Sequence, residues 1–340
     1  IQEKLNLSAS GNGKIISLMK FKLFPIAGDA SYRSFYRLTS SKGSRIIVFS
    51  QREKYQNLIA YSAVNNFLKK NRIFTPKLYN HNYKNGIIII EDLGNNSFYK
   101  VLLKQKNKFF TYKKLVNLLI KIQKIEPKSK ITNVFGKAHF LKKYTTKFLH
   151  KESDLFFDWY LPLFLKKNKV KSIKKRTKKI LSKLYNSLYF SNSYFVHRDF
   201  HAQNLMKLGN KIGVIDTQDA IIGNPTYDLV SLIDDVRIKT SSKLKEKVFK
   251  YYLKKTIFVH RKNSNKFLED FNILSVQRSL KIIGIFSRLF KRDKKNNYLK
   301  FIPYTWKILE TRMGSEIFSD LKEILNKNVN KKIRTKVAHK

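Results

Sequence analysis

The alternation of hydrophobic and polar positions is strand-like over the first part of the chain. Residues 26–38 and 45–50 are rich in turn residues and β-formers, and Gly86 opens a run of isoleucines at residues 87–90. A β-branched run bounded by turn residues is typical of a strand that is buried on both faces. Residues 58–70 instead space their apolar side chains like one face of a helix. The pattern therefore predicts a β-rich region with one helix.

After residue 95 the spacing of apolar positions becomes mainly helical. Two stripes have this spacing, one made of Leu115, Leu118, Leu119 and Ile122 and the other of Leu244, Val248, Tyr251 and Tyr252. Neither an internal repeat nor a low-complexity linker interrupts the chain, so residues 91–95 are the best candidate for a hinge. We therefore expect an α+β protein with a β-rich N-terminal lobe over residues 1–94 and a mostly helical C-terminal lobe over residues 95–340.

The composition points to a folded protein of a reducing compartment. A chain of 340 residues that is 42% hydrophobic and 14% aromatic can bury at least one substantial core. The absence of cysteine excludes a disulfide framework, a cysteine-based zinc site and thiol catalysis. No run reaches the ~20 apolar residues that span a bilayer, and residues 1–20 lack the order of a signal peptide. We therefore expect a cytoplasmic protein without a membrane span.

The net charge of +48 raises the question of a nucleic-acid partner, because dense Lys and Arg side chains attract phosphates. The excess Lys residues are spread over the whole chain and accompany many Ile, Asn, Phe and Tyr residues, all of which have AT-rich codons. The densest block, residues 166–179, has the pattern of an amphipathic helix. Its apolar positions, with those that follow it, are Val170, Ile173, Ile180, Leu181 and Leu184. Codon bias and a solvated helical face explain this charge more simply than a specific nucleic-acid site does.

The strongest chemical signal is the segment His197-Arg198-Asp199-Phe200-His201-Ala202-Gln203-Asn204, which fits the H-R-D-x-x-x-x-N catalytic loop of protein kinases. Its context agrees with this interpretation. Phe195-Val196 precedes the loop as a short predicted strand, and residues 211–216 follow as a second strand that ends in Asp216. This is the order of strand, catalytic loop, hairpin strand and metal-binding Asp that phosphoryl transfer uses.

These residue types match what phosphoryl transfer requires, because its transition state needs a positioned acceptor and neutralised charge more than covalent help. We expect Asp199 to accept the proton of a substrate hydroxyl. We expect Asn204 and Asp216 to hold Mg²⁺ against the phosphates of ATP, since Mg²⁺ prefers hard oxygen ligands. His197 is expected to brace the loop, and the role of His201 is left open. The alternatives are a helix cap at Asp199, a turn at Asn204 and a strand end at Asp216.

Two glycine-containing segments are candidates for phosphate binding. Gly11-Asn12-Gly13 starts like a nucleotide-binding G-x-G-x-x-G motif, but Ile16 replaces its third glycine and no strand precedes it, so a turn is the better interpretation. Ala27-Gly28-Asp29-Ala30-Ser31 lies between two predicted strands, where small residues let backbone N–H groups approach a phosphate. A plain hairpin explains this second segment equally well.

Several segments together carry a family resemblance. They are residues 27–33, residues 91–94, the loop 197–204, residues 216–220 with 227–232, and residues 277–281 with 284–286. They resemble the aminoglycoside-phosphotransferase superfamily and, within it, the bacterial cell-wall sugar kinases, the N-acetylmuramate/N-acetylglucosamine 1-kinases. The resemblance spans residues 25–309. It implies a two-lobed protein-kinase-like fold and ATP- and Mg²⁺-dependent phosphorylation of the anomeric hydroxyl of an amino sugar in peptidoglycan recycling.

The resemblance also implies roles for further residues. Nucleotide binding falls to Gly28, Ser31, Arg33 and Glu91. Binding of the acceptor sugar falls to Arg198, Asp219, Arg278, Lys281 and Arg288. Structural roles fall to His197 and Asp228. A small amino sugar is thus the implied partner, with no specific nucleic acid.

Two features depart from the family pattern. Thr217 stands where the family more often has an aromatic residue, and residues 46–50 lack the Lys that pairs with the ATP phosphates in protein kinases. Either a substitute cation, with Arg33, Arg37 and Lys54 as candidates, or an inactive kinase would explain the missing Lys. We favour the substitute cation, because the cell-wall sugar kinases that the chain resembles also lack a standard Lys at this place.

Residues 277–290 are a candidate for the acceptor site. On a helix with ~100° per residue, one side collects polar residues and a glycine, namely Gln277, Arg278, Lys281, Gly284 and Arg288. The cations would suit a sugar that carries a carboxylate, whereas a basic surface helix is the alternative. The competing functions are a kinase of the same fold for an aminoglycoside, choline or homoserine, and a non-catalytic basic pseudokinase module that binds nucleic acid or an anionic surface.

Overall fold

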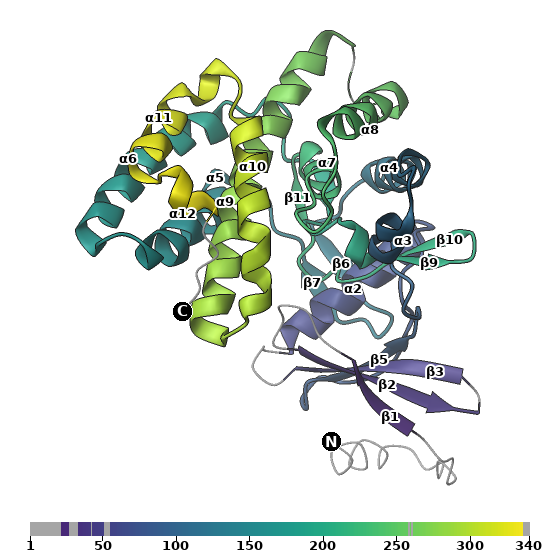
Figure 1. Cartoon of the computed structure of the whole chain (residues 1–340). Coiled ribbons are helices and arrows are strands. Elements are labelled where there is room, and N and C mark those ends of the chain that lie inside the picture. Colours follow the sequence, from purple (N-terminus) through teal and green to yellow (C-terminus); the bar gives the residue numbers. More distant parts are fainter. Residues whose placement is uncertain are drawn as a thin grey trace. The chain divides into compact units, whose positions relative to one another are not determined.

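The computed structural model describes residues 22–26, 33–41, 43–50, 55–257, 259 and 261–335. These residues form two compact units, which we call the sheet unit and the helical unit (Figure 1). The sheet unit comprises the described residues up to Phe98 together with Lys128–Leu141 and Gln203–Ala220. The helical unit comprises Tyr99–Pro127, Lys142–Ala202 and the described residues from Ile221 onward. The chain thus passes from the helical unit to the sheet unit inside the catalytic-loop motif.

An antiparallel sheet of five strands, in the order β1-β2-β3-β5-β4, forms the core of the sheet unit (Figure 1). The strands are β1 Lys22–Ile26, β2 Arg33–Ser40, β3 Gly43–Ser50, β4 Leu78–Asn82 and β5 Ile87–Glu91. The predicted isoleucine strand is confirmed as β5, which lies inside the sheet with Ile88 opposite Val48. The predicted helix is confirmed as α2, Gln56–Lys70, which packs its buried side chains on one face of the sheet.

Two short hairpins complete the sheet unit, β6 Lys130–Thr132 with β7 Ala138–Phe140 and β9 Leu205–Leu208 with β10 Lys211–Val214. Backbone hydrogen bonds fix the β9–β10 hairpin within the unit. The N–H of Lys207 donates to the carbonyl of Asn96 at 2.7 Å, and that of Val214 donates to the carbonyl of Phe74 at 2.9 Å. Asp216 follows β10 closely, so these bonds set its position within the sheet unit.

The helical unit consists of helices and one short strand pair. The helices are α3 Phe98–Lys104, α4 Phe109–Gln123, α5 Thr146–Leu155, α6 Lys167–Asn186, α7 Thr226–Ile233, α8 Ser242–Lys255, α9 Ser264–Asp293, α10 Ile302–Arg312, α11 Ser319–Asn328 and α12 Lys331–Thr335. Short helical turns lie at Phe156–Tyr160, Leu161–Leu163, Arg261–Asn263, Asn296–Phe301 and Glu316–Phe318, and a further turn, Ala202–Asn204, lies where the chain passes into the sheet unit. β8, Tyr194–Val196, pairs antiparallel with β11, Ile221–Gly223. The two predicted apolar stripes lie on α4 and α8.

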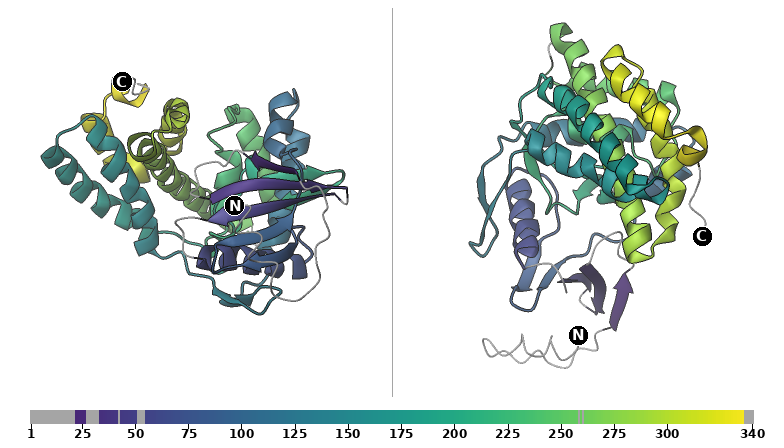
Figure 2. Two further views of the ribbon diagram at one scale, coloured as in Figure 1. Left: turned by 90° about the horizontal axis from the view of Figure 1, so that it is seen from below. Right: turned by 90° about the vertical axis from the view of Figure 1, so that its left-hand side faces the viewer.

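α9 is the central helix of this unit and packs against α5, α7 and α10 (Figure 2). Its residues from Ile273 to Gly284 are all buried, so the alternative of a basic surface helix is wrong for this part of residues 277–290. A Cβ atom added at Gly284 would lie 2.3 Å from the carbonyl carbon of Leu155 on α5. The close approach that this glycine permits is therefore made by the backbone of α5.

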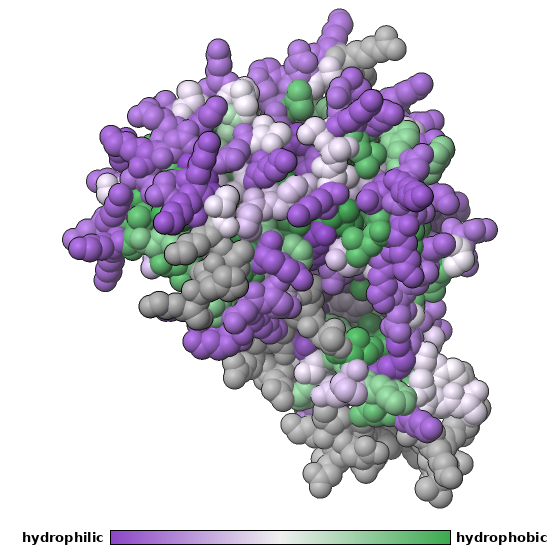
Figure 3. All heavy atoms as spheres, viewed as in Figure 1, coloured by the Kyte–Doolittle hydropathy of each residue, from purple (hydrophilic) through white to green (hydrophobic). Residues whose placement is uncertain are grey.

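The predicted basic amphipathic helix is confirmed as α6. Its apolar positions, which include Val170, Ile173, Leu181 and Leu184, are buried, whereas most of its Lys side chains are exposed. Figure 3 shows hydrophilic side chains spread over the visible face of the helical unit and interspersed with hydrophobic ones. Within the described ranges, no helix combines the length and the apolar character needed to cross a membrane.

Candidate active site

The catalytic-loop segment begins where β8 ends, and α7 holds its main chain. The backbone N–H groups of His197 and Arg198 donate to the two carboxylate oxygens of Asp228 at 2.7 and 2.9 Å. The Ser231 hydroxyl donates to the carbonyl of Arg198 at 3.2 Å. Asp228 and Ser231 both lie on α7 and are buried. α7 therefore fixes the backbone immediately before Asp199.

His197 and Arg198 shape the turn that leads into Asp199. The His197 side chain is buried, and its Nδ1 atom accepts a hydrogen bond from the N–H of Asp199 at 3.3 Å. Arg198 has a φ of 72°, in the left-handed region that residues with a side chain rarely adopt. Such a conformation costs about 1–3 kcal/mol and persists only where its surroundings fix it. The bonds from Asp228 and Ser231 supply that support.

Positive charges surround Asp199 within the helical unit. Burial disfavours the charged form of its carboxyl group, but the cations Lys281, Arg278 and Arg198 outweigh this effect and hold the pKa of Asp199 below its usual value. Asp199 is therefore ionised at neutral pH, as a proton acceptor must be.

Glu152, a buried carboxylate on α5, binds two of the predicted acceptor residues. It forms ion pairs with Arg198 and with Lys281, whose Nζ atom lies 2.8 Å away. The side-chain amide of Gln277 donates to Glu152 at 3.1 Å, and the Tyr144 hydroxyl donates to it as well. Arg198 and Lys281 are thus partners of Glu152, and a direct contact of either with a sugar stays a prediction.

Arg278 differs from its neighbours on α9. The residue is only 5% exposed, yet no hydrogen bond or ion pair joins its guanidinium to another residue in the described part of the chain. Its charge acts on Asp199 and on Tyr227. A buried cation that forms no ion pair is a candidate for binding an anionic group. Arg288, also on α9, is half-buried, and its predicted role stays a prediction.

The sheet unit carries the residues that are predicted to bind metal and phosphate. Asp216 has a φ of 62°, again in the left-handed region. Arg33 on β2 is buried, and its guanidinium donates to Asp216 Oδ1 and to the side-chain oxygen of Gln218, both at 2.9 Å. Gln218 in turn donates to Asp216 at 3.0 Å and to Asp219 at 3.1 Å. We call Arg33, Asp216, Gln218 and Asp219 the Arg33 network.

The donor atoms available here suit Mg²⁺. The hydrogen bonds that Asp216 accepts from Arg33 and Gln218 both use Oδ1, so among the described residues Oδ2 is open to a cation. The Asp216 side chain is 37% exposed, and the neighbouring Ile215 N–H donates to the carbonyl of Asn204 at 3.0 Å. The described ranges contain no group of three or more His, Asp or Glu side chains that could hold a metal. Mg²⁺ does not need such a cluster, since it commonly takes one or two carboxylates and keeps several waters. Asp216 and Asn204 therefore fit this metal.

Two of the three candidate substitutes for the missing Lys have defined surroundings. The guanidinium of Arg33 contacts Asp216, whereas that of Arg37 contacts the predicted hinge, residues 91–95. Arg37 forms an ion pair of 2.5 Å with Asp92 and donates to the side chain of Asn95 at 2.9 Å. Lys54 lies outside the described residues. The geometry therefore favours Arg33.

The contacts of the remaining predicted site residues say less about function. Thr217 is buried, and its hydroxyl donates to the side-chain oxygen of Asn65 on α2 at 2.7 Å, which explains a small polar residue at this position. Glu91, at the end of β5, accepts a hydrogen bond from the N–H of Lys77 at 3.0 Å, and its predicted role in nucleotide binding stays a prediction. Outside the described residues lie Gly28, Ser31 and the Gly11-Asn12-Gly13 segment.

Sequence reasoning missed Glu152 and Arg237. Burial and the charge of Arg237 lower the pKa of His201 well below its usual value, so Arg237 belongs to the surroundings of the loop. Its guanidinium lies 3.8 Å from Asp235. Neither Glu152 nor Arg237 stands in a motif, and single charged residues in a chain with 71 Lys and Arg residues give no signal of their own.

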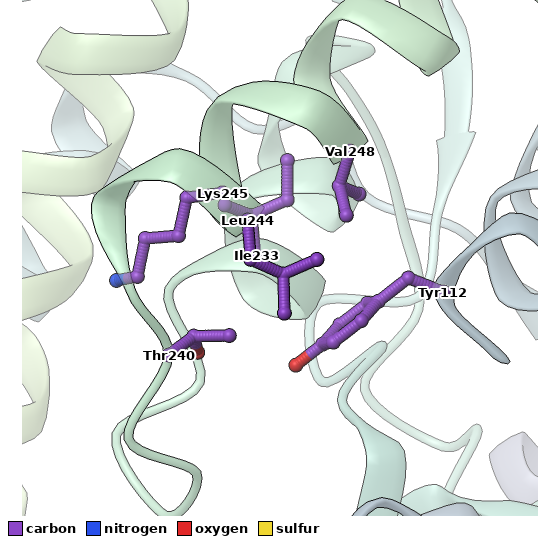
Figure 4. Close-up of a pocket in the computed structure, with 6 residues that line it drawn as sticks. All are labelled: Tyr112, Ile233, Thr240, Leu244, Lys245 and Val248. Atoms are coloured by element: carbon purple, nitrogen blue, oxygen red, sulfur yellow. The ribbon is translucent and has the colours of Figure 1, made fainter. Parts of the chain in front are cut away.

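One pocket of the helical unit is lined by none of these residues. Its lining side chains are Tyr112, Ile233, Thr240, Leu244, Lys245 and Val248 (Figure 4). The ammonium group of Lys245 pairs with Asp234 at 2.8 Å. The pocket contains none of the predicted site residues, so it adds nothing to the candidate site.

Comparison with known proteins agrees with the motifs. The model of the phosphotransferase enzyme family matches residues 22–262. The chain is 29% identical to an N-acetylmuramate/N-acetylglucosamine kinase of Pseudomonas aeruginosa, over 86% of this chain and 84% of that protein. It is 27% identical to the protein of the same name from Neisseria meningitidis, over 83% of both chains.

Solved structures show the same fold. An ADP-bound aminoglycoside phosphotransferase superposes with a TM-score of 0.58 at 15% identity, over 91% of this chain and 96% of that one. A choline/ethanolamine kinase family protein from Mesorhizobium loti superposes with a TM-score of 0.60 at 10% identity, over 96% and 99% of the two chains. These likenesses confirm the expected α+β fold. The family model covers well over half of the sequence, and the chain therefore belongs to the phosphotransferase enzyme family.

Proposed function

We propose that this chain is an ATP- and Mg²⁺-dependent kinase that phosphorylates the anomeric hydroxyl of N-acetylmuramate and N-acetylglucosamine. The observation that carries the proposal is the similarity, over 86% of the chain, to a kinase named for both sugars. In this proposal residues 1–94 bind the nucleotide, and residues 95–340 supply the catalytic loop and the acceptor site. The reaction would take place in the cytoplasm, where it would return cell-wall sugars to nucleotide-sugar synthesis.

Asp199 acts as the general base in the proposed mechanism. Its carboxylate accepts the proton of the anomeric hydroxyl while the hydroxyl oxygen attacks the γ-phosphorus of ATP, and the bond to the β-phosphate oxygen breaks. The low pKa of Asp199 favours the ionised form that this step needs. His197, Asp228 and Ser231 support the loop around it. General-base catalysis of this kind contributes ~10²- to 10⁴-fold to the rate.

Asp216 and Asn204 are the proposed ligands of Mg²⁺, which neutralises negative charge on the ATP phosphates when it is bound. Arg33 is the proposed substitute for the missing Lys. The planar fork of a guanidinium suits contacts to two partners at once. Its bonds to Asp216 and Gln218 hold Arg33 in place before a nucleotide arrives.

Arg278 is the proposed contact for the acceptor. A buried guanidinium that forms no ion pair with a neighbouring side chain favours an anionic group, such as the carboxylate of N-acetylmuramate. The same charge opposes a cationic aminoglycoside, as does the net charge of +48. These two observations favour the amino sugars over the competing acceptors.

A coupled assay of ADP release tests the proposal against N-acetylmuramate, N-acetylglucosamine, an aminoglycoside and choline. We expect turnover with both sugars and a sugar phosphate that mild acid hydrolyses, as it does an anomeric phosphate. Turnover with the aminoglycoside or choline alone would support a kinase for another hydroxyl. No turnover with any acceptor, combined with steeply salt-dependent binding to random DNA, would support a non-catalytic binding module.

A further inference from the structure

We propose that Asp270 on α9 is a positioning residue, which holds the start of the catalytic loop, residues 197–199, through hydrogen bonds to residues 189–190 and to Asn224. The first set of bonds fixes the segment that leads into β8, and the second fixes the start of α7. This inference rests on the proposed function, because it assumes that Asp199 is the base. All of the residues involved lie in the helical unit.

The carboxylate of Asp270 is buried and accepts hydrogen bonds from two chain segments. Oδ1 accepts from the N–H of Tyr189 and Oδ2 from the N–H of Phe190, both at 2.9 Å. Oδ2 also accepts from the side-chain amide of Asn224 at 2.7 Å. Burial outweighs these bonds and raises the pKa of Asp270, so its ionised form is less favourable in the fold than in water. Asp270 therefore contributes the geometry of three hydrogen bonds rather than a stabilising charge.

Asn224 carries the contact from Asp270 to α7. Its side-chain amide also donates to the carbonyl of Phe190 at 3.0 Å, and its side-chain oxygen accepts from the N–H and the hydroxyl of Thr226, both at 2.9 Å. Thr226 is the first residue of α7, and the first N–H groups of a helix have no partner within it. The same side chain thus caps α7 and binds Asp270.

These bonds close a ring that includes the catalytic loop. From residues 189–190 the chain runs through β8 into the loop, whose first two N–H groups donate to Asp228 on α7. From Asp228 the ring returns through the first turn of α7 to Asp270. β8 and α7 therefore support the loop together, and Asp270 joins them at the far side of the ring. Without its bonds, β8 and α7 can shift apart and displace the backbone before Asp199.

A second contact keeps the start of α7 attached when Asp270 is altered. The side-chain amide of Gln123 on α4 donates to the carbonyl of Pro225 at 2.7 Å, and the Tyr252 hydroxyl on α8 donates to the side-chain oxygen of Gln123 at 2.7 Å. α7 is thus bound by α4 as well as by α9. We therefore expect the loss of Asp270 to displace α7 and the loop without unfolding the helical unit.

Asp270→Asn keeps the shape of the side chain but turns an amide group toward hydrogen-bond donors. We expect kcat per folded molecule, measured with near-ultraviolet circular dichroism, to fall by about 10- to 10²-fold, because a misplacement of ~1 Å can cost 10²-fold. The KM for ATP should stay unchanged, since the proposed ligands of the nucleotide and of Mg²⁺ lie in the sheet unit. The matched control is Glu269→Gln, which removes the neighbouring exposed carboxylate, paired with Lys266, and should leave kcat unchanged.

Exchanging the two side chains tests the contact itself. Asn224→Asp alone brings two carboxylates together, so we expect a loss at least as large as that of Asp270→Asn. In the variant with both changes an amide again faces a carboxylate, and its loss should be smaller than that of Asn224→Asp alone. A loss that equals the product of the single losses within about twofold is the behaviour of independent sites and would overturn the proposal.

Hydrogen exchange separates positioning of the loop from a general loss of stability. The chain contains seven histidines, so protein labelled with ¹⁵N-histidine gives few amide signals. We expect the amide of His197, which donates to Asp228, to exchange about tenfold faster in Asp270→Asn, while that of His150 inside α5 stays unchanged. Equal acceleration at both amides, or no acceleration at His197, would show that Asp270 does not position the loop.

The exchange measurement needs no acceptor. If the wild type phosphorylates neither amino sugar, the proposed function fails, whereas exchange at His197 still decides the role of Asp270. If Asp270→Asn does not fold, Asn224→Ser takes its place, because a serine hydroxyl can still cap α7 but falls short of Asp270. Unchanged kcat and unchanged exchange at His197 in that variant would equally overturn the proposal.

Discussion

Arg33 donates a hydrogen bond of 2.9 Å to the Oδ1 atom of Asp216. The same guanidinium reaches Gln218, so one side chain links β2 to the segment that follows β10. We expect Arg33→Met to weaken the binding of Mg²⁺-ATP by about 1.5–3 kcal/mol, the worth of a charge-assisted hydrogen bond. Arg33→Lys should recover only part of this loss, because an ammonium group cannot bridge both partners.

Isothermal calorimetry with the nucleotide measures these affinities. The matched control is Arg45→Met on the neighbouring strand β3, where the exposed guanidinium stacks on Tyr79 at 4.4 Å. Equal affinities for the Arg33→Met and Arg45→Met variants would show that Arg33 does not replace the missing Lys.

Asp199→Asn removes the proposed proton acceptor and keeps the shape of the side chain. We expect kcat to fall by ~10²- to 10⁴-fold, with thermal stability and the KM for ATP nearly unchanged. Steady-state kinetics with N-acetylglucosamine measure the effect, and Asp320→Asn on the surface of α11 is the control. An Asn variant that keeps most of its activity would refute the role of Asp199.

Asp216→Ala removes the carboxylate proposed to bind Mg²⁺. We expect the affinity for ATP in the presence of Mg²⁺ to fall by at least about tenfold, equivalent to 1.4 kcal/mol, because Mg²⁺ loses a hard oxygen ligand. Titrations with and without Mg²⁺ separate this effect from the loss of the Arg33 contact. If the affinity for ATP fell equally with and without Mg²⁺, Asp216 would act only through the Arg33 network and not as a ligand of Mg²⁺.

Arg278→Ala tests how the acceptor is recognised. We expect kcat/KM for N-acetylmuramate to fall by the equivalent of about 1.5–3 kcal/mol, and that for N-acetylglucosamine to fall much less, because one sugar alone carries a carboxylate. We expect a change in the same direction for Arg288→Ala. Arg292→Ala, near the end of α9 where the guanidinium pairs with Asp293, is the control. Equal losses for the two sugars would contradict a carboxylate contact.

The stability of the protein should depend on pH through Glu152. Burial disfavours the charged form of Glu152, but Lys281 and Arg198 outweigh it and lower its pKa from 4.5 to about 2. A carboxyl group with a lowered pKa stabilises the fold above pH 4.5, and this contribution is lost as the pH falls toward 2. Between pH 6 and pH 3 the wild type should lose about 2 kcal/mol more of its free energy of unfolding than Glu152→Gln does.

Urea unfolding at the two pH values measures this difference. The control is Glu246→Gln, because the carboxylate of Glu246 on α8 is exposed to solvent. Parallel losses in the wild type and in Glu152→Gln would mean that the ion pairs of Glu152 do not contribute to the pH dependence of folding.

The parts of the fold that the sequence predicted are those with local signals. β5 is a run of β-branched residues, and α2, α4 and α8 repeat their apolar positions at helical spacing. The catalytic loop is a motif of neighbouring residues, so Asp199, Asn204 and Asp216 could be named from their spacing alone. These signals depend on residues close together in the chain.

The surroundings of the site could not be predicted, because they depend on residues that meet only after folding. In the sequence, nothing distinguishes Lys281 by its charge from the many other cations of this basic chain. Its ammonium group can be buried because Glu152, far away in the sequence, supplies its counter-charge. The contact of Arg33 could not be predicted either, because its partner Asp216 belongs to a different segment of the sheet unit. A single sequence contains no record of which charges pair.

The glycine at position 284 bears on how relatives of this chain are compared. Because a methyl group there would meet the backbone of Leu155, any substitution would push α5 and α9 apart and carry Glu152 with it. The residue that sets the distance between two charged groups thus has no side chain and touches neither of them. Comparisons that count only shared polar residues would overlook it, and a homologue that kept Glu152 and Lys281 but lost this glycine would be a poor guide to the activity of this enzyme.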